Sequence, residues 1–153
     1  MHWKFHSKPD KENNFGFVYL ITNKKTKKAY IGCKQYFVKR NGKKIESNWR
    51  SYTGSSKYLN EDIKKLGKKN FTFKILLECK NKRSLRYYEC YYQMLHKVLT
   101  TTLEGTDEPA YYNNYVGGKF YRPVQELDRD WETFDNNTHN ILNFFCSYTL
   151  IKF

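Results

Sequence analysis

Several features that would place this 153-residue chain in a common class of proteins are missing from its sequence. No apolar run approaches the roughly 18 residues needed to cross a bilayer, and the N-terminal residues lack the apolar stretch of a secretion signal. The four cysteines have neither a C-x-x-C spacing nor regular histidine partners, which argues against a zinc site and against a disulfide framework. We therefore expect a reduced, cytoplasmic protein with no membrane partner.

Signature motifs of the large metabolic enzyme families are missing as well. The sequence contains no G-x-x-x-x-G-K-[ST], G-x-G-x-x-G, G-x-S-x-G or H-E-x-x-H pattern. Nucleotide hydrolysis, dinucleotide binding, serine hydrolysis and zinc proteolysis therefore have no support in the sequence.

Acidic residues are scarce, with 15 Asp and Glu against 28 Lys and Arg, so the formal net charge is +13. Twenty-five of the basic residues lie in residues 1–121, and such an excess indicates an anionic partner. Aromatic residues make up 18% of the chain, which is too many for an intrinsically disordered protein. We expect an N-terminal arm at 1–15, one folded domain over 16–121 and a C-terminal extension at 122–153 that packs back onto the domain.

Hydrophobic periodicity predicts a small α+β fold. Runs rich in β-formers at 17–22 and 28–34 predict an antiparallel hairpin, and Asn41-Gly42 predicts a tight turn in an extra hairpin within 35–50. Apolar residues at helical spacing predict two helices. The fold class expected is a mainly antiparallel three-stranded sheet flanked by helices. The expected ranges are about 56–66 and 85–99 for the helices and 71–79 for the third strand.

These elements carry a series of short motifs in a fixed order. Tyr19 ends the run GFVY, residues 30–32 read Tyr-Ile-Gly, and the runs GSSKYL, FTFKILLEC, YYECYY and YYNNY follow. Over about residues 16–115 the sequence resembles the GIY-YIG nuclease superfamily. It is most similar to short phage nucleases that carry a W-x-x-Y-x-G-S-S run, which here occupies residues 49–56.

The resemblance implies a GIY-YIG type fold and a metal-dependent DNA endonuclease, of a phage-encoded homing or a restriction type, in a bacterial or phage-infected cell. It implies Tyr19 as the general base and Tyr30 as its partner. It also implies Glu89 as the ligand of Mg²⁺ or Mn²⁺. Asn113 would support the site by hydrogen bonding, with Asn114 as the alternative. The partner expected is double-stranded DNA, bound by a monomer or a homodimer.

Phosphodiester hydrolysis needs a base and positive charge around the transition state. A phenol close to Lys and Arg side chains is expected to have its pKa lowered from about 10. Arg40 lies at the family's usual distance after the second motif, and Arg50 competes with it for the scissile phosphate. Lys34 is a third candidate, and together with Lys43 and Lys44 it is expected to contact the DNA backbone.

Structural alternatives stay open for several of these residues. An ion pair with Arg86 or Lys97 is the alternative role of Glu89. Family members often carry a histidine near the site, and here Lys44 or Tyr52 would have to replace it.

Two other functions are also open. One is a non-catalytic nucleic-acid binder in which a basic sheet face rich in aromatic residues stacks unpaired bases. The other, weaker one is a nuclease of the D…E-x-K type, built on Asp10 and Glu78.

Overall fold

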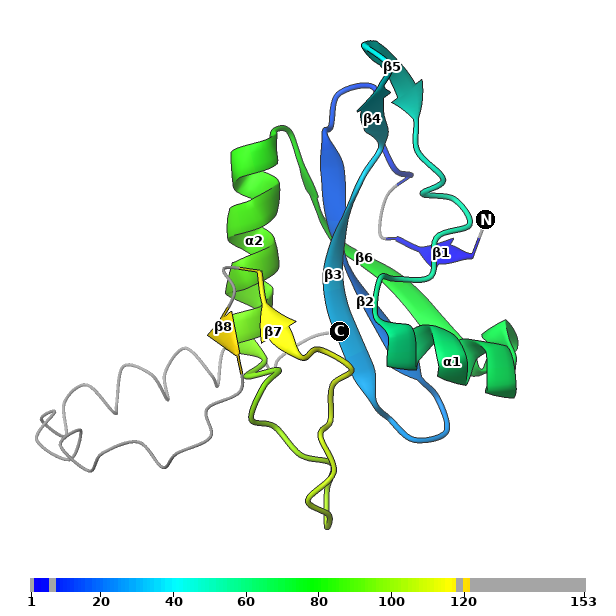
Figure 1. Ribbon diagram of the computed structural model, residues 1–153, viewed down its shortest axis with the longest axis vertical. Coiled ribbons are helices and arrows are strands. Elements are labelled where there is room, and N and C mark those ends of the chain that lie inside the picture. Colours follow the sequence, from blue (N-terminus) through cyan, green and yellow to red (C-terminus); the bar gives the residue numbers. More distant parts are fainter. Residues whose placement is uncertain (1, 6–7, 118–119, 122–153) are drawn as a thin grey trace, which may run out of the picture. The chain divides into compact units, whose positions relative to one another are not determined.

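A four-stranded mixed sheet in the order β1-β6-β2-β3 forms the centre of the protein in a computed structural model, which describes residues 2–5, 8–117 and 120–121 (Figure 1). Helix α1 packs on one face of this sheet and helix α2 on the other. The elements are β1 (Trp3–Lys4), β2 (Gly16–Asn23), β3 (Ala29–Gln35), β4 (Phe37–Arg40), β5 (Lys43–Glu46), α1 (Lys57–Leu66), the short 3₁₀ helix η1 (Lys68–Asn70), β6 (Phe71–Cys79), α2 (Lys82–Leu95), β7 (Tyr115–Val116) and β8 (Phe120–Tyr121).

The expected C-terminal extension at 122–153 lies outside the described residues. Its packing on the domain and the division of the chain at residue 122 therefore stay predictions. Within the described part of the chain, no helix is long and apolar enough to cross a membrane.

Strands β2 and β3 form the antiparallel hairpin that the sequence predicts, with Tyr19 opposite Gly32. Side chains alternate between the two faces of a strand, so Tyr19 and Tyr30 both face the α1 layer while Val18 faces α2. Gly32 is required by this packing, because a Cβ at this position would lie 2.6 Å from the Tyr19 hydroxyl oxygen. The hairpin therefore places both tyrosine rings on the same side of the sheet.

The prediction of a mainly antiparallel three-stranded sheet is wrong in its strand count, because β1 pairs in parallel with β6 and makes the sheet a mixed one of four strands. Trp3 holds this strand in place: its side chain is buried, and its indole N–H donates to the carbonyl oxygen of Trp49 at 2.7 Å. A two-residue strand shows no alternation that a sequence pattern could reveal. Part of the expected N-terminal arm thus belongs to the sheet.

Helix α2 begins three residues before its predicted start and ends before its predicted end. The Asn81 side chain caps it by accepting the backbone N–H of Ser84 at 2.9 Å. Lys97, with a φ of 46°, adopts a left-handed conformation just beyond the helix. The apolar stripe that predicted a longer helix therefore continues into the core in a non-helical segment.

The extra hairpin within 35–50 is confirmed as β4 and β5. Its turn residues Asn41 and Gly42 have φ values of 50° and 74°, as a tight hairpin turn requires. Figure 1 shows this hairpin projecting beyond the end of the four-stranded sheet.

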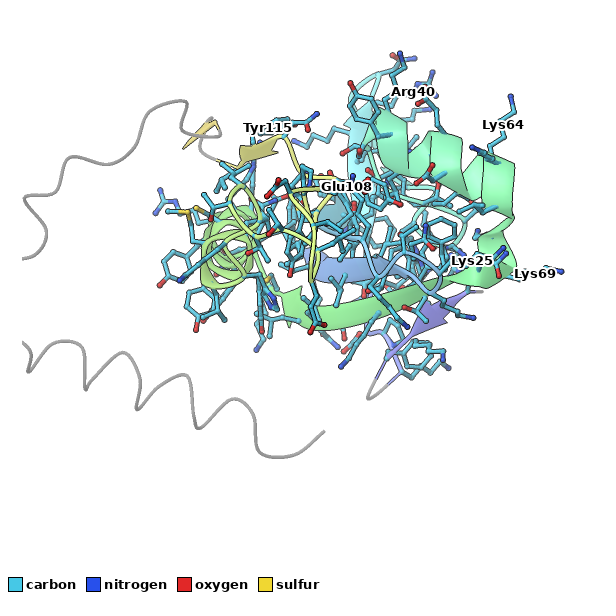
Figure 2. The ribbon with its side chains drawn as sticks, turned by 90° about the horizontal axis from the view of Figure 1, so that it is seen from below. Lys25, Arg40, Lys64, Lys69, Glu108 and Tyr115 are labelled. Atoms are coloured by element: carbon cyan, nitrogen blue, oxygen red, sulfur yellow. The ribbon has the colours of Figure 1, made fainter. Side chains whose placement is uncertain are left out.

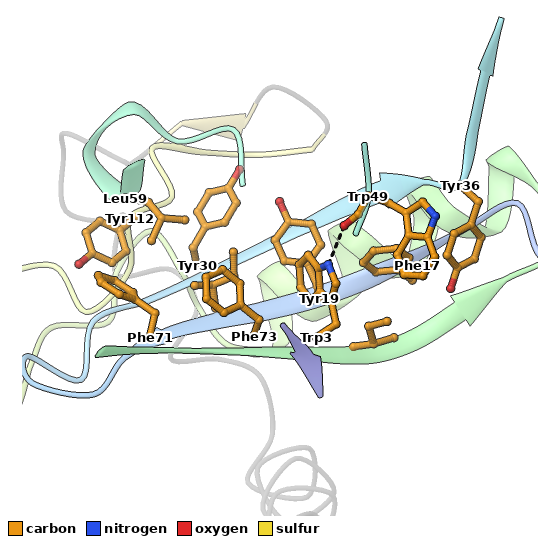
Figure 3. Close-up of a cluster of buried hydrophobic side chains, with 12 residues drawn as sticks. Trp3, Phe17, Tyr19, Tyr30, Tyr36, Trp49, Leu59, Phe71, Phe73 and Tyr112 are labelled. Atoms are coloured by element: carbon orange, nitrogen blue, oxygen red, sulfur yellow. Dashed lines mark hydrogen bonds between the residues drawn. The ribbon is translucent and has the colours of Figure 1, made fainter. Parts of the chain in front are cut away.

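Most of the aromatic residues on the α1 face are core residues. Figure 3 shows Trp3, Phe17, Tyr19 and Trp49 packed into one cluster of buried side chains on the sheet. Tyr19 and Phe17 are 1% and 0% exposed. The sheet face expected to stack unpaired bases is therefore closed, which removes the platform of the non-catalytic binder.

Candidate active site

The outer edge of β3 borders a cleft of about 550 Å³. Five parts of the chain form its walls: β3, Val38 of β4, residues 55–58 at the start of α1, one side of α2, and residues 112–117. A phenol and a carboxylate, Tyr30 and Glu89, line the cleft. The cationic side chains that line it are Lys34, Lys57, Lys82 and Arg86.

Tyr30 and Glu89 reach this cleft from opposite sides of the sheet. Tyr30 packs in the α1 layer, whereas Glu89 belongs to α2 on the other face. They meet because β3 is the edge strand, so side chains from both layers can reach around it. The edge position of β3 is therefore what allows one cleft to hold both groups.

The Tyr30 hydroxyl lies 2.8 Å from the Ser55 hydroxyl, at the start of the α1 segment. Burial raises the pKa of Tyr30 to about 12; the Ser55 hydrogen bond lowers it, while Tyr52 and Glu89 raise it further. The expected lowering of this pKa is therefore wrong, because loss of hydration outweighs the basic surroundings.

Tyr19 lies behind Tyr30 and is not among the residues that line the cleft. Its ring centroid is 6.1 Å from that of Tyr30 and 6.0 Å from that of Tyr52. Burial, followed by the neighbouring Tyr30 and Tyr52, raises the pKa of Tyr19 well above its usual value. The expected lowering is wrong here too, and the Tyr19 hydroxyl is enclosed by aromatic neighbours.

Glu89 belongs to a stripe of α2 residues that all line the cleft, spaced by four, three and four positions: Lys82, Arg86, Glu89 and Gln93. Burial and then the charge of Glu89 raise the pKa of the neighbouring Cys33 thiol. Neither Arg86 nor Lys97 forms an ion pair with Glu89 among the described residues. The alternative role of Glu89 as an ion-pair partner therefore finds no support.

The donor set of the cleft fits a hard divalent cation held by a single carboxylate. Mg²⁺ takes oxygen ligands and commonly keeps several waters while bound by one or two carboxylates and substrate phosphates. Glu89 supplies one half-buried carboxylate in a cleft with space beside it. No group of three or more His, Cys, Asp or Glu side chains that could hold a metal occurs among the residues that the structure covers.

Asn113 holds the edge strand β3 at Ile31, the central residue of the Tyr-Ile-Gly motif. Its side-chain oxygen accepts the backbone N–H of Ile31 at 3.1 Å, and its amide donates to the Ile31 carbonyl at 2.8 Å. Gln93 donates to the same carbonyl at 3.0 Å and accepts the N–H of Gly117 at 2.8 Å. Asn113 thus acts on the backbone that carries Tyr30, whereas Asn114 is exposed.

Neither arginine predicted for the scissile phosphate lines the cleft. Arg40 is at the end of β4, in the projecting hairpin, and Figure 2 shows it well separated from Tyr115 on the cleft wall. Arg50 pairs with Glu46 and stacks 4.5 Å from the Trp49 ring. The β4–β5 hairpin thus carries Arg40, and Glu46 and Trp49 hold Arg50 beyond the base of that hairpin.

Arg86 is the arginine that lines the cleft, and it is not one of the arginines predicted from the sequence to bind the scissile phosphate. One signal could have found it: Arg86 precedes Glu89 by three positions on a predicted helix, so the two residues share a face. Lys82, seven positions before Glu89, lies on that face too.

The three lysines expected to contact DNA are in different places. Lys34 lines the cleft, where its ammonium group donates to the Asn48 side chain at 2.8 Å and lies 4.0 Å from the Tyr52 ring centroid. Burial lowers its pKa. Lys43 and Lys44 are exposed on β5 in the projecting hairpin.

Asp10 and Glu78, the pair for a D…E-x-K nuclease, do lie close together, but both have structural roles. Glu78 accepts hydrogen bonds from the Tyr36 hydroxyl at 2.5 Å and from the Asp10 backbone N–H at 3.0 Å. The Asp10 carboxylate accepts hydrogen bonds from Asn13. These carboxylates close a surface loop, and neither lines the cleft.

Comparison with known proteins places the chain in a family. The model of the family described as "Putative endonuclease segE, GIY-YIG domain" matches residues 3–116. No curated protein and no solved structure matches the chain. The matched range includes β1 and ends in β7, so it spans every element that borders the cleft. The chain belongs to the GIY-YIG nuclease superfamily, and its domain is of the SegE type.

Proposed function

We propose that this nuclease domain is a metal-dependent endonuclease that hydrolyses phosphodiester bonds of double-stranded DNA in the cleft at the edge of β3. The observation that carries the proposal is the gathering of the Tyr30 phenol, the Glu89 carboxylate and four cationic side chains around a single cleft in a chain of net charge +13. A phosphodiester is the anionic substrate that this set of groups suits.

The cationic side chains bind and orient the phosphate. Arg86 donates two hydrogen bonds from a planar group that stays charged, which suits two oxygens of one phosphate. Lys34 is held by Asn48 and Tyr52, so it presents its charge to the cleft from a fixed position. Lys57 and Lys82 also line the cleft and suit the neighbouring phosphates of the strand.

Of the two motif tyrosines, Tyr30 lines the cleft and Tyr19 does not, so we assign Tyr30 the contact with the attacking water. With a pKa of about 12 it is neutral at pH 7, and it orients the water through its hydroxyl group. A cation bound beside Tyr30 would favour its phenolate form, and the phenolate could accept the proton of that water. Tyr19 supports the ring of Tyr30 from behind and is a positioning residue in this proposal.

Glu89 is the residue that would hold Mg²⁺ or Mn²⁺, together with phosphate oxygens and water. The bound metal would supply Lewis-acid stabilisation of the charge that develops on the phosphate and on the leaving oxygen. Asn113 does not need to touch the substrate, because it acts by fixing the backbone of β3.

Cleavage of supercoiled plasmid tests the proposal. The wild-type protein is expected to nick or linearise the plasmid with Mg²⁺ or Mn²⁺, and chelation is expected to stop it. Glu89→Gln and Tyr30→Phe are each expected to lose about 10²-fold or more of the rate while they retain DNA binding.

Glu108→Gln and Tyr91→Phe are matched controls, because both side chains are exposed and lie outside the cleft (Glu108 is labelled in Figure 2). They are expected to cleave at the wild-type rate. Undiminished cleavage by both Glu89→Gln and Tyr30→Phe would refute the assigned site.

A further inference from the structure

The hairpin formed by β4 and β5 carries charge that the fold does not neutralise. It has four basic residues close to its turn: Lys39, Arg40, Lys43 and Lys44. None of the four makes an ion pair with any residue that the structure describes. The hairpin's carboxylate, Glu46, is already engaged at its base by Lys11, Trp49 and Arg50.

The strand register brings these like charges directly opposite one another. Lys39 pairs with Lys44, and Arg40 pairs with Lys43. Like charges in directly opposed positions destabilise a β-ladder. Stability of the hairpin does not explain this arrangement, whereas binding to a polyanion would remove the repulsion.

The two faces of the hairpin differ, and one of them adjoins the cleft. Because side chains alternate, Arg40 and Lys43 share a face with Val38 and Ile45. Val38 lines the active-site cleft, so this face continues the cleft wall outward. Val38 and Ile45 are 37% and 39% exposed, which gives the face two cationic and two apolar side chains open to solvent.

The hairpin is also anchored firmly at its base. The backbone N–H of Tyr36 donates to Phe15 at 3.0 Å, and that of Ser47 donates to Tyr36 at 2.8 Å. The Ser47 hydroxyl donates to the Gln35 carbonyl at 2.6 Å. The direction in which the hairpin projects is therefore set by the body of the domain.

We propose that the β4–β5 hairpin enters the major groove of the duplex beside the scissile phosphate and reads base edges with the face that carries Val38, Arg40, Lys43 and Ile45. This inference rests on the proposed function, because it takes duplex DNA as the substrate. A two-stranded β-ribbon fits the major groove, which is about 12 Å wide. Arg and Lys pair with guanine there and apolar side chains contact the thymine methyl group, which matches this face.

Binding measurements without cleavage test the inference. All proteins in this test carry Glu89→Gln, and no metal is added, so that binding is measured without cleavage. Fluorescence anisotropy reports binding to a duplex of about three helical turns. Adding Arg40→Ala and Lys43→Ala is expected to weaken binding about tenfold or more. Lys64→Ala with Lys69→Ala removes the same charge at exposed positions outside the cleft, which Figure 2 labels, and is expected to have a smaller effect.

A second duplex, whose pyrimidines carry a bulky substituent at C5, separates groove entry from simple attraction to phosphate. The substituent fills the major groove, so it is expected to weaken binding by the intact hairpin to the level of the Arg40→Ala, Lys43→Ala protein. That double variant is expected to bind both duplexes equally. The inference is overturned if the substituent weakens both proteins alike, if it weakens neither, or if the hairpin variant binds as well as the Lys64, Lys69 control.

The two proposals fail separately. If the wild type cleaves plasmid but the C5 substituent does not weaken its binding, the groove-reading role of the hairpin is refuted and the proposed nuclease activity stands. A wild type that binds as expected through its hairpin but does not cleave would remove the nuclease and leave the hairpin as a DNA-binding element.

Discussion

At the scale of single residues, Tyr30 combines a buried ring with a hydroxyl group that opens onto the cleft. Its pKa, raised by burial to about 12, lies above the unfolded value of 10.0, so the folded state favours the protonated phenol. The associated stability is complete below pH 10 and is lost as the pH rises toward about 12. We predict that the free energy of unfolding falls over this range and that Tyr30→Phe flattens part of the fall.

Denaturant unfolding of both proteins between pH 8 and about 12 measures this difference. Burial raises the pKa of Tyr19 in both proteins, and Tyr30→Phe removes only the smaller part that Tyr30 adds to it, so the difference between the curves reports Tyr30 together with its coupling to Tyr19. Parallel curves for the two proteins over the whole range would show that Tyr30 ionises as freely in the folded state as in the unfolded chain.

Asn113 offers a test of a residue that acts on the backbone. Asn113→Leu would leave the N–H of Ile31 without its acceptor in a buried position, which costs about 1–3 kcal/mol. We predict this loss in chemical denaturation, accompanied by weaker cleavage. Asn114→Leu, at the exposed neighbouring position, is the control and should change stability little. Equal losses of unfolding free energy for the two substitutions would contradict the role of Asn113 in holding the β3 backbone.

Sequence reasoning selected residues that line the cleft where a motif and an element coincide. Tyr30 and Glu89 could both be selected from the sequence and both line the cleft. Counting positions from the second motif selected Arg40, which does not line the cleft because the chain there folds as the β4–β5 hairpin. Which of two similar neighbours, Asn113 or Asn114, turns inward depends on packing that no local pattern encodes.

At the scale of elements, helix α2 carries the cleft stripe of Arg86 and Glu89, so its first turn matters. We predict that Asn81→Ala costs about 1 kcal/mol in thermal or denaturant unfolding, because the side chain caps the helix. Asn81→Asp should retain the cap. Ser84→Ala is the control, since the hydrogen bond uses the Ser84 backbone and not its hydroxyl. A larger loss of unfolding free energy for Ser84→Ala than for Asn81→Ala would show that the Asn81 side chain does not cap the helix.

Elements with a strong local pattern were predictable, and those that depend on tertiary contacts were not. Strand β6 (Phe71–Cys79) occupies the predicted range, because its apolar and β-branched residues form a run of ordinary strand length. The turn of the β4–β5 hairpin was predictable from Asn41-Gly42. The end of α2 was not, because the apolar periodicity continues past Lys97 although the backbone turns out of the helix there.

At the scale of the whole domain, the N-terminal strand β1 completes the aromatic core. The Trp3 ring lies within 5.2 Å of the ring centroids of Phe17 and Tyr19, so it supports the face of the sheet that positions Tyr30. We predict that Trp3→Ala costs about 3–5 kcal/mol of unfolding free energy. Phe5→Ala, at a residue that is 39% exposed, is the matched control and should cost far less. Similar losses would mean that β1 is dispensable.

The central claim is that the cleft at the edge of β3 is where the phosphodiester bond is broken, and single-turnover cleavage of duplex DNA by Arg86→Ala and Arg50→Ala tests it most directly. Arg86 lines the cleft, whereas Arg50 is paired with Glu46 outside it. If the bond is broken in this cleft, Arg86→Ala loses about 10²-fold of the rate or more and Arg50→Ala cleaves almost as fast as the wild type. A slow Arg50→Ala beside an unimpaired Arg86→Ala would contradict this claim.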